Sequence, residues 1–309
     1  MKKMKAYVRN DAASNAIELA EVPIPEVGES QVLVEVRAFG VGVHDRYFIP
    51  SHANFPYPIG TEASGIITSI GNKVTDFKVG DRVIFSSSLQ PQGGPWAQYA
   101  VVPKSSLIPM PEKLSFVEGA AIPVAGRAAL ESIGTLDLKK NDTLFIAGAS
   151  GAIGTLVIQL AVACGIRVAG SASRKNHAYM LSLGAEVVVD HSAPDWKRVV
   201  TQWGQSGVDA ALAVQPGTAD DCMDVVKVRG KVVTVSGDRV VPKRNITVQQ
   251  IMHQEKTQLE LVNLVSDIAA AQIRLVIEHV YSFEQAIDAL EKTETRHARG
   301  KVVVEISGA

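Results

Sequence analysis

The chain has 309 residues, 46% of them hydrophobic and 20% charged, which is typical of a globular protein with one or two domains. Its formal net charge of -1 argues against a strongly basic nucleic-acid surface. No run of about 18 apolar residues occurs and the N-terminal MKKMKAYV lacks an apolar stretch, so we expect no membrane span, no secretion signal and a cytoplasmic setting.

The first third of the chain is predicted to be rich in β-structure. Short runs with many β-branched residues are separated by Pro and Gly, and they cover residues 5–9, 31–39, 65–70 and 81–86. In residues 31–39 apolar and polar side chains partly alternate, which predicts a strand with one buried face. We expect a small antiparallel, barrel-like domain.

From about Pro123 onward, helical patterns alternate with short apolar strands. This alternation predicts a parallel sheet covered by helices on both faces. The expected helices are 125–133, 151–164, 175–183, 196–203 and 219–226, and the expected strands are 143–147, 167–169, 187–190, 208–214 and 231–236.

The last part of the chain is expected to form a helix at 255–271, a strand at 275–280, a helix at 282–292 with a cap at Ser282, and a final strand at 301–306. Residues 244–260 are polar, and the sequence does not place a sixth parallel strand or a dimer contact there.

A glycine-rich turn joins the strand at 143–147 to the apolar helix that follows. It reads Gly148-Ala149-Ser150-Gly151-Ala152-Ile153-Gly154, with Ala149 where the strict dinucleotide pattern has glycine. Backbone N–H groups at such a helix start, together with the helix dipole, bind a pyrophosphate, although an ordinary tight turn is the alternative. The expected contacts are Ser150, Gly151, Ala152, Ile153 and Gly154.

The end of the second parallel strand favours NADPH over NADH. NAD sites usually carry an acid there for the ribose hydroxyl groups, but this chain has Ser171, Ser173, Arg174 and Lys175. Arginine and serine suit a 2′-phosphate, and a cation at a helix start is mildly unfavourable unless an anion binds it. The alternative is that Arg174 and Lys175 form a solvated helix start.

The two cysteines, Cys164 and Cys222, do not have the spacing of a structural zinc site. Cys164 falls within an apolar helix pattern, so we expect a buried, inert thiol there.

Six motifs in order resemble the medium-chain dehydrogenase/reductase superfamily, and within it the zinc-free, zeta-crystallin-like quinone oxidoreductase branch. The resemblance covers nearly the whole chain. Besides the glycine turn, the motifs are PIGTEASG at 58–65, KVGDRV at 78–83, GGPWAQYA at 93–100, AAIPVAG at 120–126 and ARGKVV at 298–303.

The resemblance implies an α/β protein with two domains and an active site in the cleft. A GroES-like catalytic domain would comprise residues 1–122 and 273–309, and a Rossmann domain residues 123–272. The implied reaction is hydride transfer from NADPH to a quinone or an α,β-unsaturated carbonyl. It implies a small-molecule partner and leaves a homodimer open.

Zinc is not expected. In zinc-dependent relatives a Cys and a His bind the catalytic metal, and here Val43 and Thr61 are interpreted as occupying those positions. Valine cannot bind a metal and threonine is a poor zinc ligand. Glu62 is expected to have a structural hydrogen-bonding role.

The resemblance places substrate contacts in residues 42–47. Tyr47 and His44 are the candidate catalytic residues, because a phenol and an imidazole can each hydrogen-bond a carbonyl or supply a proton. Asp45 is expected to fix the loop, and Gly42 stands where the family usually has Asn. Further cofactor contacts are expected at the ends of later strands, from Val214, Gln215, Ser236 and Gly237.

Two alternatives stay open at this point. The chain is either an enzyme or an NADPH-binding protein with weak or no catalysis and a partner-binding or regulatory role. A third reading is a zinc-free synthase or acyl-thioester reductase module of the same superfamily.

Overall fold

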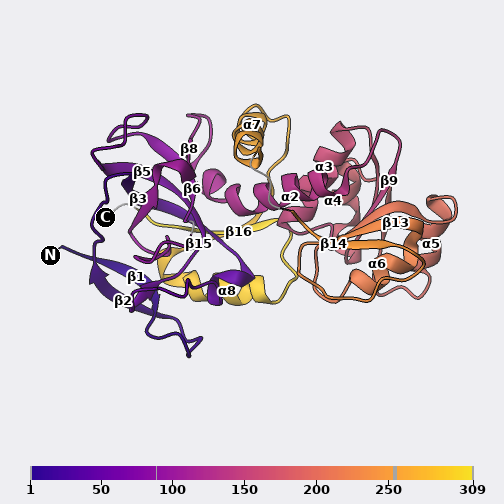
Figure 1. The fold of residues 1–309 in the computed structure, drawn as a ribbon, viewed down its shortest axis with the longest axis horizontal. Helices are drawn as coiled ribbons and strands as arrows, with labels where there is room; N and C mark the ends of the chain where they lie inside the picture. The colour runs from indigo at the N-terminus through magenta and orange to yellow at the C-terminus, as the bar shows by residue number, and fades with distance from the viewer. Residues whose placement is uncertain (1, 88, 253–255, 308–309) are drawn as a thin grey trace. The chain divides into compact units, whose positions relative to one another are not determined.

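The computed structural model describes residues 2–87, 89–252 and 256–307, in two compact units. Unit 1 comprises residues 1–124 and 277–309, and unit 2 comprises residues 125–276 (Figure 1). The sequence had suggested divisions after residues 122 and 272. The roles expected for the two domains stay predictions at this point.

Unit 1 contains a small and a large sheet. In the small sheet the order is β2 (Glu18–Pro23), β1 (Lys3–Arg9) and β4 (Tyr57–Pro58). The large sheet runs β15 (Ile277–Ser282), β16 (Lys301–Glu305), β3 (Gln31–Val41), β5 (Glu62–Ile70), β6 (Arg82–Ser86) and β8 (Leu107–Pro109), while β7 (Tyr99–Pro103) also pairs with β3.

The predicted antiparallel character of this unit holds with one exception. β15 and β16 pair in parallel, because helix α8 (Ala286–Glu294) connects them in a crossover, whereas the other strand pairs here are antiparallel. The partial alternation predicted in β3 is confirmed, because Val32, Val34 and Val36 are buried. The predicted cap at Ser282 is also confirmed, as Ser282 and Gln285 form a capping box at the 3-10 turn η4 (Phe283–Gln285).

Other short elements of unit 1 position its loops. Helix α1 (Phe116–Ala120) begins with a capping box between Ser115 and Glu118. The 3-10 turns are η1 (Val43–Arg46) and η2 (Lys104–Ser106). The core is aromatic in part, with the rings of Phe39 and Trp96 stacked at a centroid distance of 5.0 Å.

Unit 2 is built around a parallel sheet, as the sequence predicted, and the sheet has six strands where the sequence placed five. Its order is β11 (Val187–Val189), β10 (Arg167–Ser171), β9 (Thr143–Ala147), β12 (Val208–Ala213), β13 (Val226–Thr234) and β14 (Thr247–Gln250).

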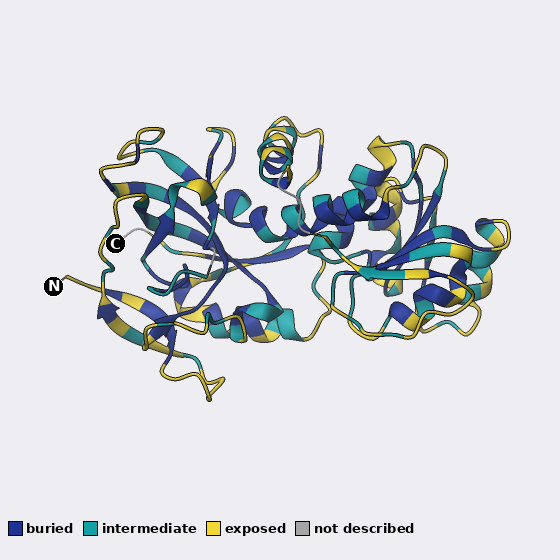
Figure 2. Ribbon diagram, viewed as in Figure 1, coloured by how far each residue is buried: buried dark blue, intermediate teal, exposed yellow. Residues whose placement is uncertain are grey.

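Helices cover both faces of this sheet, so it is doubly wound. Figure 1 shows α5 (Trp196–Trp203) and α6 (Ala219–Val225) on the face opposite α2 (Pro123–Leu136) and α3 (Ala152–Ala163). The turn η3 (Arg174–Asn176) leads into α4 (His177–Ser182), and α7 (Thr257–Ala269) follows β14. The central strands are dark blue in Figure 2, because side chains on both faces are buried.

Several predicted details differ from the structure. The strand that the sequence did not place is β14, whose sequence TVQQ is polar because it pairs on one side only, with β13. β13 begins at Val226, five residues earlier than expected, with an irregular register against β12. α7 begins at Thr257, and the predicted helix start at 255 lies outside the described residues.

The expectation of a buried Cys164 was wrong. Cys164 is exposed, because it is the C-cap of α3 and the last turn of that helix, with Val162 and Ala163, faces solvent. Cys222, on α6, is the buried thiol, and burial raises its pKa.

Within the described part of the chain, no helix combines the length and apolar character needed to cross a membrane.

Candidate functional site

In unit 2 the glycine turn has the backbone geometry of a tight strand-to-helix connection. Gly148 has φ +85°, in the left-handed region, and a Cβ there would lie 2.6 Å from Cγ of Gln215. A Cβ on Gly154 would lie 2.6 Å from Cα of Ala149, so glycine lets α3 pack closely against the turn. A Cβ on Gly151 would meet only a carbonyl oxygen at 3.7 Å, so the space in front of the turn is open.

The start of α3 leaves backbone donors free. Gly151 is the N-cap and supplies no side-chain cap. The N–H groups of the first helical residues, Ala152, Ile153 and Gly154, have no partner within the helix. Free amides and a helix dipole are the features that favour a bound anion, and the predicted cofactor contacts here stay a prediction.

The end of β10 lies beside this turn. The N–H of Ala149 donates to the carbonyl oxygen of Ser171 at 3.1 Å. Arg174 and Lys175 are exposed, and within the described chain neither has an ion-pair partner. Two cations without an ion-pair partner in the described chain therefore follow the strand end that contacts the glycine turn.

Asn176 connects these two segments, and sequence reasoning missed it. Its Nδ2 donates to Oγ of Ser150 at 3.2 Å and to Oγ of Ser173 at 3.4 Å. Asn176 is 3% exposed, and its Oδ1 is shielded from solvent without a partner in the described chain. A polar residue after a strand end was the only available signal, and it does not reveal a contact across 26 residues.

The remaining predicted cofactor residues follow β12 and β13. Asp238 joins the two loops, because its Oδ1 accepts from the N–H of Gly217 at 3.0 Å and its Oδ2 from that of Ala219 at 3.2 Å. Oγ of Ser236 is shielded from solvent and has no hydrogen-bond partner in the described chain. Val214, Gln215, Ser236 and Gly237 thus lie at the carboxyl ends of adjacent parallel strands.

In unit 1 the turn η1 carries a hydrogen-bonded chain of three side chains. His44 Nε2 lies 2.9 Å from Oγ1 of Thr61, and that hydroxyl donates to Oδ1 of Asp45 at 2.8 Å. Asp45 is fully buried, and its Oδ2 accepts the N–H of Gly42 at 2.7 Å. The expected loop-fixing role of Asp45 matches these contacts.

The side chain of Tyr47 is more exposed than that of His44. Its side chain is 59% exposed, and it forms the C-cap of η1 through its backbone N–H. The neighbouring Arg46 is held by Glu294 of α8, with Nε and Oε1 2.5 Å apart, and this hydrogen bond raises the pKa of the guanidinium. His44 is therefore fixed by side-chain contacts, whereas Tyr47 projects from the turn.

Glu62 takes part in a buried ion pair with Lys301 of β16. Its Oε2 accepts the N–H of Val124, at the start of α2, at 2.7 Å. These contacts are structural, as the sequence had suggested for Glu62.

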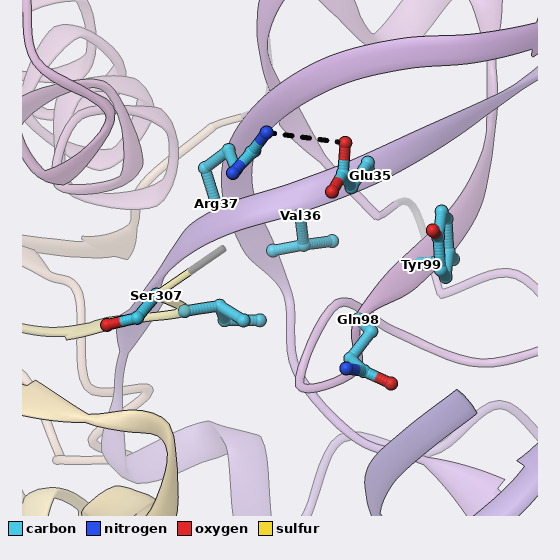
Figure 3. Close-up of a pocket in the computed structure, with 7 residues that line it drawn as sticks. Glu35, Val36, Arg37, Gln98, Tyr99 and Ser307 are labelled. Carbon is cyan, nitrogen blue, oxygen red and sulfur yellow. Dashed lines mark ion pairs between the residues drawn. The ribbon is translucent and has the colours of Figure 1, made fainter. Parts of the chain in front are cut away.

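Two surface hollows lie away from these residues. The hollow in Figure 3 has a volume of about 40 Å³, and the nearest charges are Arg37 and Glu35, 3.5 Å apart. That volume suits a single water rather than an organic acceptor. A hollow of about 330 Å³ lies between α2, α3 and α7 of unit 2. Neither includes a predicted site residue.

The fold and these sites define a class of protein: a dehydrogenase or reductase with a GroES-like unit and a Rossmann-type unit. Residues 28–112 match the family model described as an alcohol dehydrogenase GroES-like domain, and residues 183–304 match the model described as a zinc-binding dehydrogenase. The chain belongs to the medium-chain dehydrogenase/reductase superfamily of oxidoreductases.

Individual relatives match over much of the chain. It is 32% identical over 226 residues to the trans-enoyl reductase tazE of Aspergillus terreus, covering 66% of this chain and 75% of that protein. It is 29% identical to the quinone oxidoreductase of Sus scrofa, covering 92% of each. An NADPH-dependent alkenal/one oxidoreductase of Arabidopsis thaliana is 28% identical, with 98% of this chain and 80% of that protein covered.

A solved quinone oxidoreductase from Coxiella burnetii has the same fold. Its TM-score is 0.88 at 26% identity, with 99% of this chain and 100% of that chain covered.

Proposed function

We propose that this protein is an NADPH-dependent oxidoreductase that transfers hydride to a quinone or an α,β-unsaturated carbonyl without zinc. The observation that carries the proposal is the open start of α3 beside two unpaired cations, Arg174 and Lys175. The names of the relatives, quinone oxidoreductase and NADPH-dependent alkenal/one oxidoreductase, support the same reaction class.

The residues of unit 2 fit a dinucleotide phosphate. The pyrophosphate would accept hydrogen bonds from the amides of Ala152, Ile153 and Gly154. A bound nucleotide would occupy the open space before Gly151 and would hydrogen-bond the unpartnered Oγ of Ser236. The 2′-phosphate would be bound by Ser171, Ser173, Arg174 and Lys175, and the nicotinamide end would contact Val214, Gln215, Ser236 and Gly237.

When bound, the nicotinamide supplies a hydride, and the side chains of unit 1 handle the acceptor. Reduction of a conjugated carbonyl or quinone leaves negative charge on oxygen, which a nearby donor stabilises. His44 and Tyr47 are the proposed donors, since imidazole and phenol can each hydrogen-bond that oxygen or protonate the product.

We propose that the protein works without zinc, because the side chains that the structure describes do not supply a set of zinc ligands. Within the described residues no three His, Cys, Asp or Glu side chains converge, and a catalytic zinc site uses three protein ligands. Oγ1 of Thr61 is already engaged by His44 and Asp45. We expect EDTA dialysis to leave kcat unchanged within about twofold, with metal content measured by mass spectrometry. Loss of turnover that returns with added Zn²⁺ would contradict this.

The reaction itself is tested by stopped-flow oxidation of NADPH with a panel of quinones and 2-alkenals. We expect turnover with at least one class. Tight NADPH binding without turnover of any member would favour a binding or regulatory role instead.

The cofactor preference is tested by Arg174→Asp. We expect the KM for NADPH to rise by about tenfold or more while the KM for NADH falls, because the 2′-phosphate loses a charge-assisted hydrogen bond and meets a like charge. The matched control is Arg198→Asp on α5, which changes the net charge equally. An unchanged ratio of the two KM values would remove Arg174 from the cofactor site.

A further inference from the structure

The hydrogen-bonded chain at η1 fixes which nitrogen of His44 carries a permanent proton. Asp45 accepts through both oxygens, from the Thr61 hydroxyl and from the N–H of Gly42. The Thr61 hydroxyl has one hydrogen, which it donates to Asp45 at 2.8 Å. Toward His44 it can therefore only accept, so Nε2 is the protonated nitrogen.

Proton exchange is consequently confined to Nδ1. With Nε2–H engaged, Nδ1 is bare in the neutral ring and protonated in the imidazolium. Nδ1 has no hydrogen-bond partner in the described chain, and the His44 side chain is 22% exposed. Nδ1 is thus the ring nitrogen of His44 that makes no hydrogen bond in the described chain.

Gly42 makes this ring position possible. A Cβ at residue 42 would lie 2.4 Å from Cε1 and 2.9 Å from Nδ1 of His44. Any larger residue would displace the imidazole. Glycine at position 42 therefore leaves free the space in front of the backbone that the imidazole occupies.

We infer that His44 donates a proton from Nδ1 to the reduced acceptor, and that Thr61 and Asp45 are positioning residues that hold the ring in this tautomer. The inference rests on the proposed function. Hydride adds to the acceptor and leaves an oxyanion, the Nδ1–H bond breaks as the new O–H or C–H bond forms, and the neutral imidazole regains its proton from water. The net consumption is one NADPH and one proton for each acceptor reduced.

The charges around His44 are largely paired. On its own turn stand Asp45, whose Oδ1 is 3.6 Å from Nε2, and Arg46, which is bound to Glu294 of α8. Beyond Thr61 stands Glu62, which is paired with Lys301 of β16. Asp45 is thus the charge closest to the ring, and it acts on Nε2 through Thr61.

The first experiment reads the tautomer directly and does not depend on turnover. In nitrogen-15 NMR of the full chain, we expect neutral His44 to carry its proton on Nε2, and Thr61→Val to produce a mixture of tautomers. A neutral His44 protonated on Nδ1 in the unmodified protein would overturn the inference, whatever the activity.

The second experiment measures kcat against pH with the acceptor found for the unmodified protein. His44→Gln should lower kcat by about 10²-fold and remove its decline with rising pH, because the protonated imidazole is the donor. Thr61→Val and Gly42→Ala should lower kcat by about tenfold with little change in the KM for NADPH. Thr61→Ser, which keeps the hydroxyl, should restore the rate and pH profile.

Thr68→Val on β5 is the matched control, since the Thr68 hydroxyl only meets the carbonyl of Leu33. An unaltered pH profile in His44→Gln, or loss of the pH dependence in Tyr47→Phe instead, would overturn the inference. Absence of any turnover in the unmodified protein would overturn the proposed function and the donor role together, while the spectrum would still decide the tautomer.

Discussion

Asn176 connects the glycine turn to the cation-bearing turn η3 by side-chain hydrogen bonds. Replacing it with Ala removes two hydrogen bonds, each contributing about 1 kcal/mol, and leaves both serine hydroxyls to reorient. We expect the Kd for NADPH to rise by about tenfold with a small effect on kcat, as measured by fluorescence titration and steady-state kinetics. Asn263→Ala on the exposed side of α7 is the control, and equal Kd values for the two variants would contradict the assignment.

At the scale of single residues, the sequence predicted what is local and missed what is distant. The glycine turn and residues 171–175 are each a contiguous segment of the sequence, so their chemistry could be predicted from the sequence. The contacts of Asn176 with Ser150, and of His44 with Thr61, join segments that only the fold brings together. Cys164 was assigned wrongly because an apolar pattern does not show that the last turn of the helix faces solvent.

Among the elements, Asp209 of β12 connects three parallel strands near their amino ends, by contacts with β9 and β13. Its Oδ2 accepts from N–H and Oγ1 of Thr143 on β9, and its Oδ1 is bound by Lys227 of β13 at 2.8 Å. Burial opposes ionisation, but the hydrogen bonds from Lys227 and Thr143 outweigh it and hold the pKa of the carboxyl below its usual value.

Asp209→Ala should therefore lower the free energy of unfolding by about 2 kcal/mol, because the buried N–H of Thr143 loses its acceptor. Asp209→Asn, which keeps an acceptor but no charge, should lose less. Because the folded-state pKa is depressed, the charge contributes above about pH 4 and is lost as the pH falls through the folded-state value. Urea unfolding at pH 7 and pH 3 checks this: a difference between wild type and Asp209→Asn that persists unchanged at pH 3 would refute it.

Element type was predictable where the hydrophobic pattern is strong. β9, α5 and the ends of α6 follow the sequence closely, because continuous apolar strands and amphipathic helices are distinctive. β14 was not predictable, since an edge strand with one partner needs few apolar residues. The short strands β2, β4, β7 and β8 were missed because their pairing comes from distant segments.

Across the whole molecule, the buried pair of Glu62 and Lys301 joins the N-terminal part of unit 1 to its C-terminal part. Lys301→Met should lower the free energy of unfolding by about 3–5 kcal/mol, because it leaves a buried carboxylate unpaired. Adding Glu62→Gln should recover part of that loss. Thermal or urea unfolding of both variants measures the coupling, with Lys104→Met at an exposed pair as the control, expected to cost at most about 1 kcal/mol. Additive losses for Glu62→Gln and Lys301→Met would contradict a direct interaction.

The superfamily was recognisable from six short motifs, because they recur in order over nearly the whole chain. The antiparallel register of β16 against β3 was beyond the sequence, since the two strands are separated by more than 250 residues. The expected division of the chain rested on the resemblance, whereas the compact units follow from where the backbone contacts concentrate.

That unit 1 takes strands from both ends of the chain has a consequence for biosynthesis. As the polypeptide leaves the ribosome, β3 emerges early, but its neighbour β16 arrives only after all of unit 2. Until then residues 38–41 of β3, which β16 will pair with, offer unpaired amide and carbonyl groups to other strands. A nascent chain stalled before Lys301 would be a target for chaperones and prone to aggregate, although its parallel sheet is already complete.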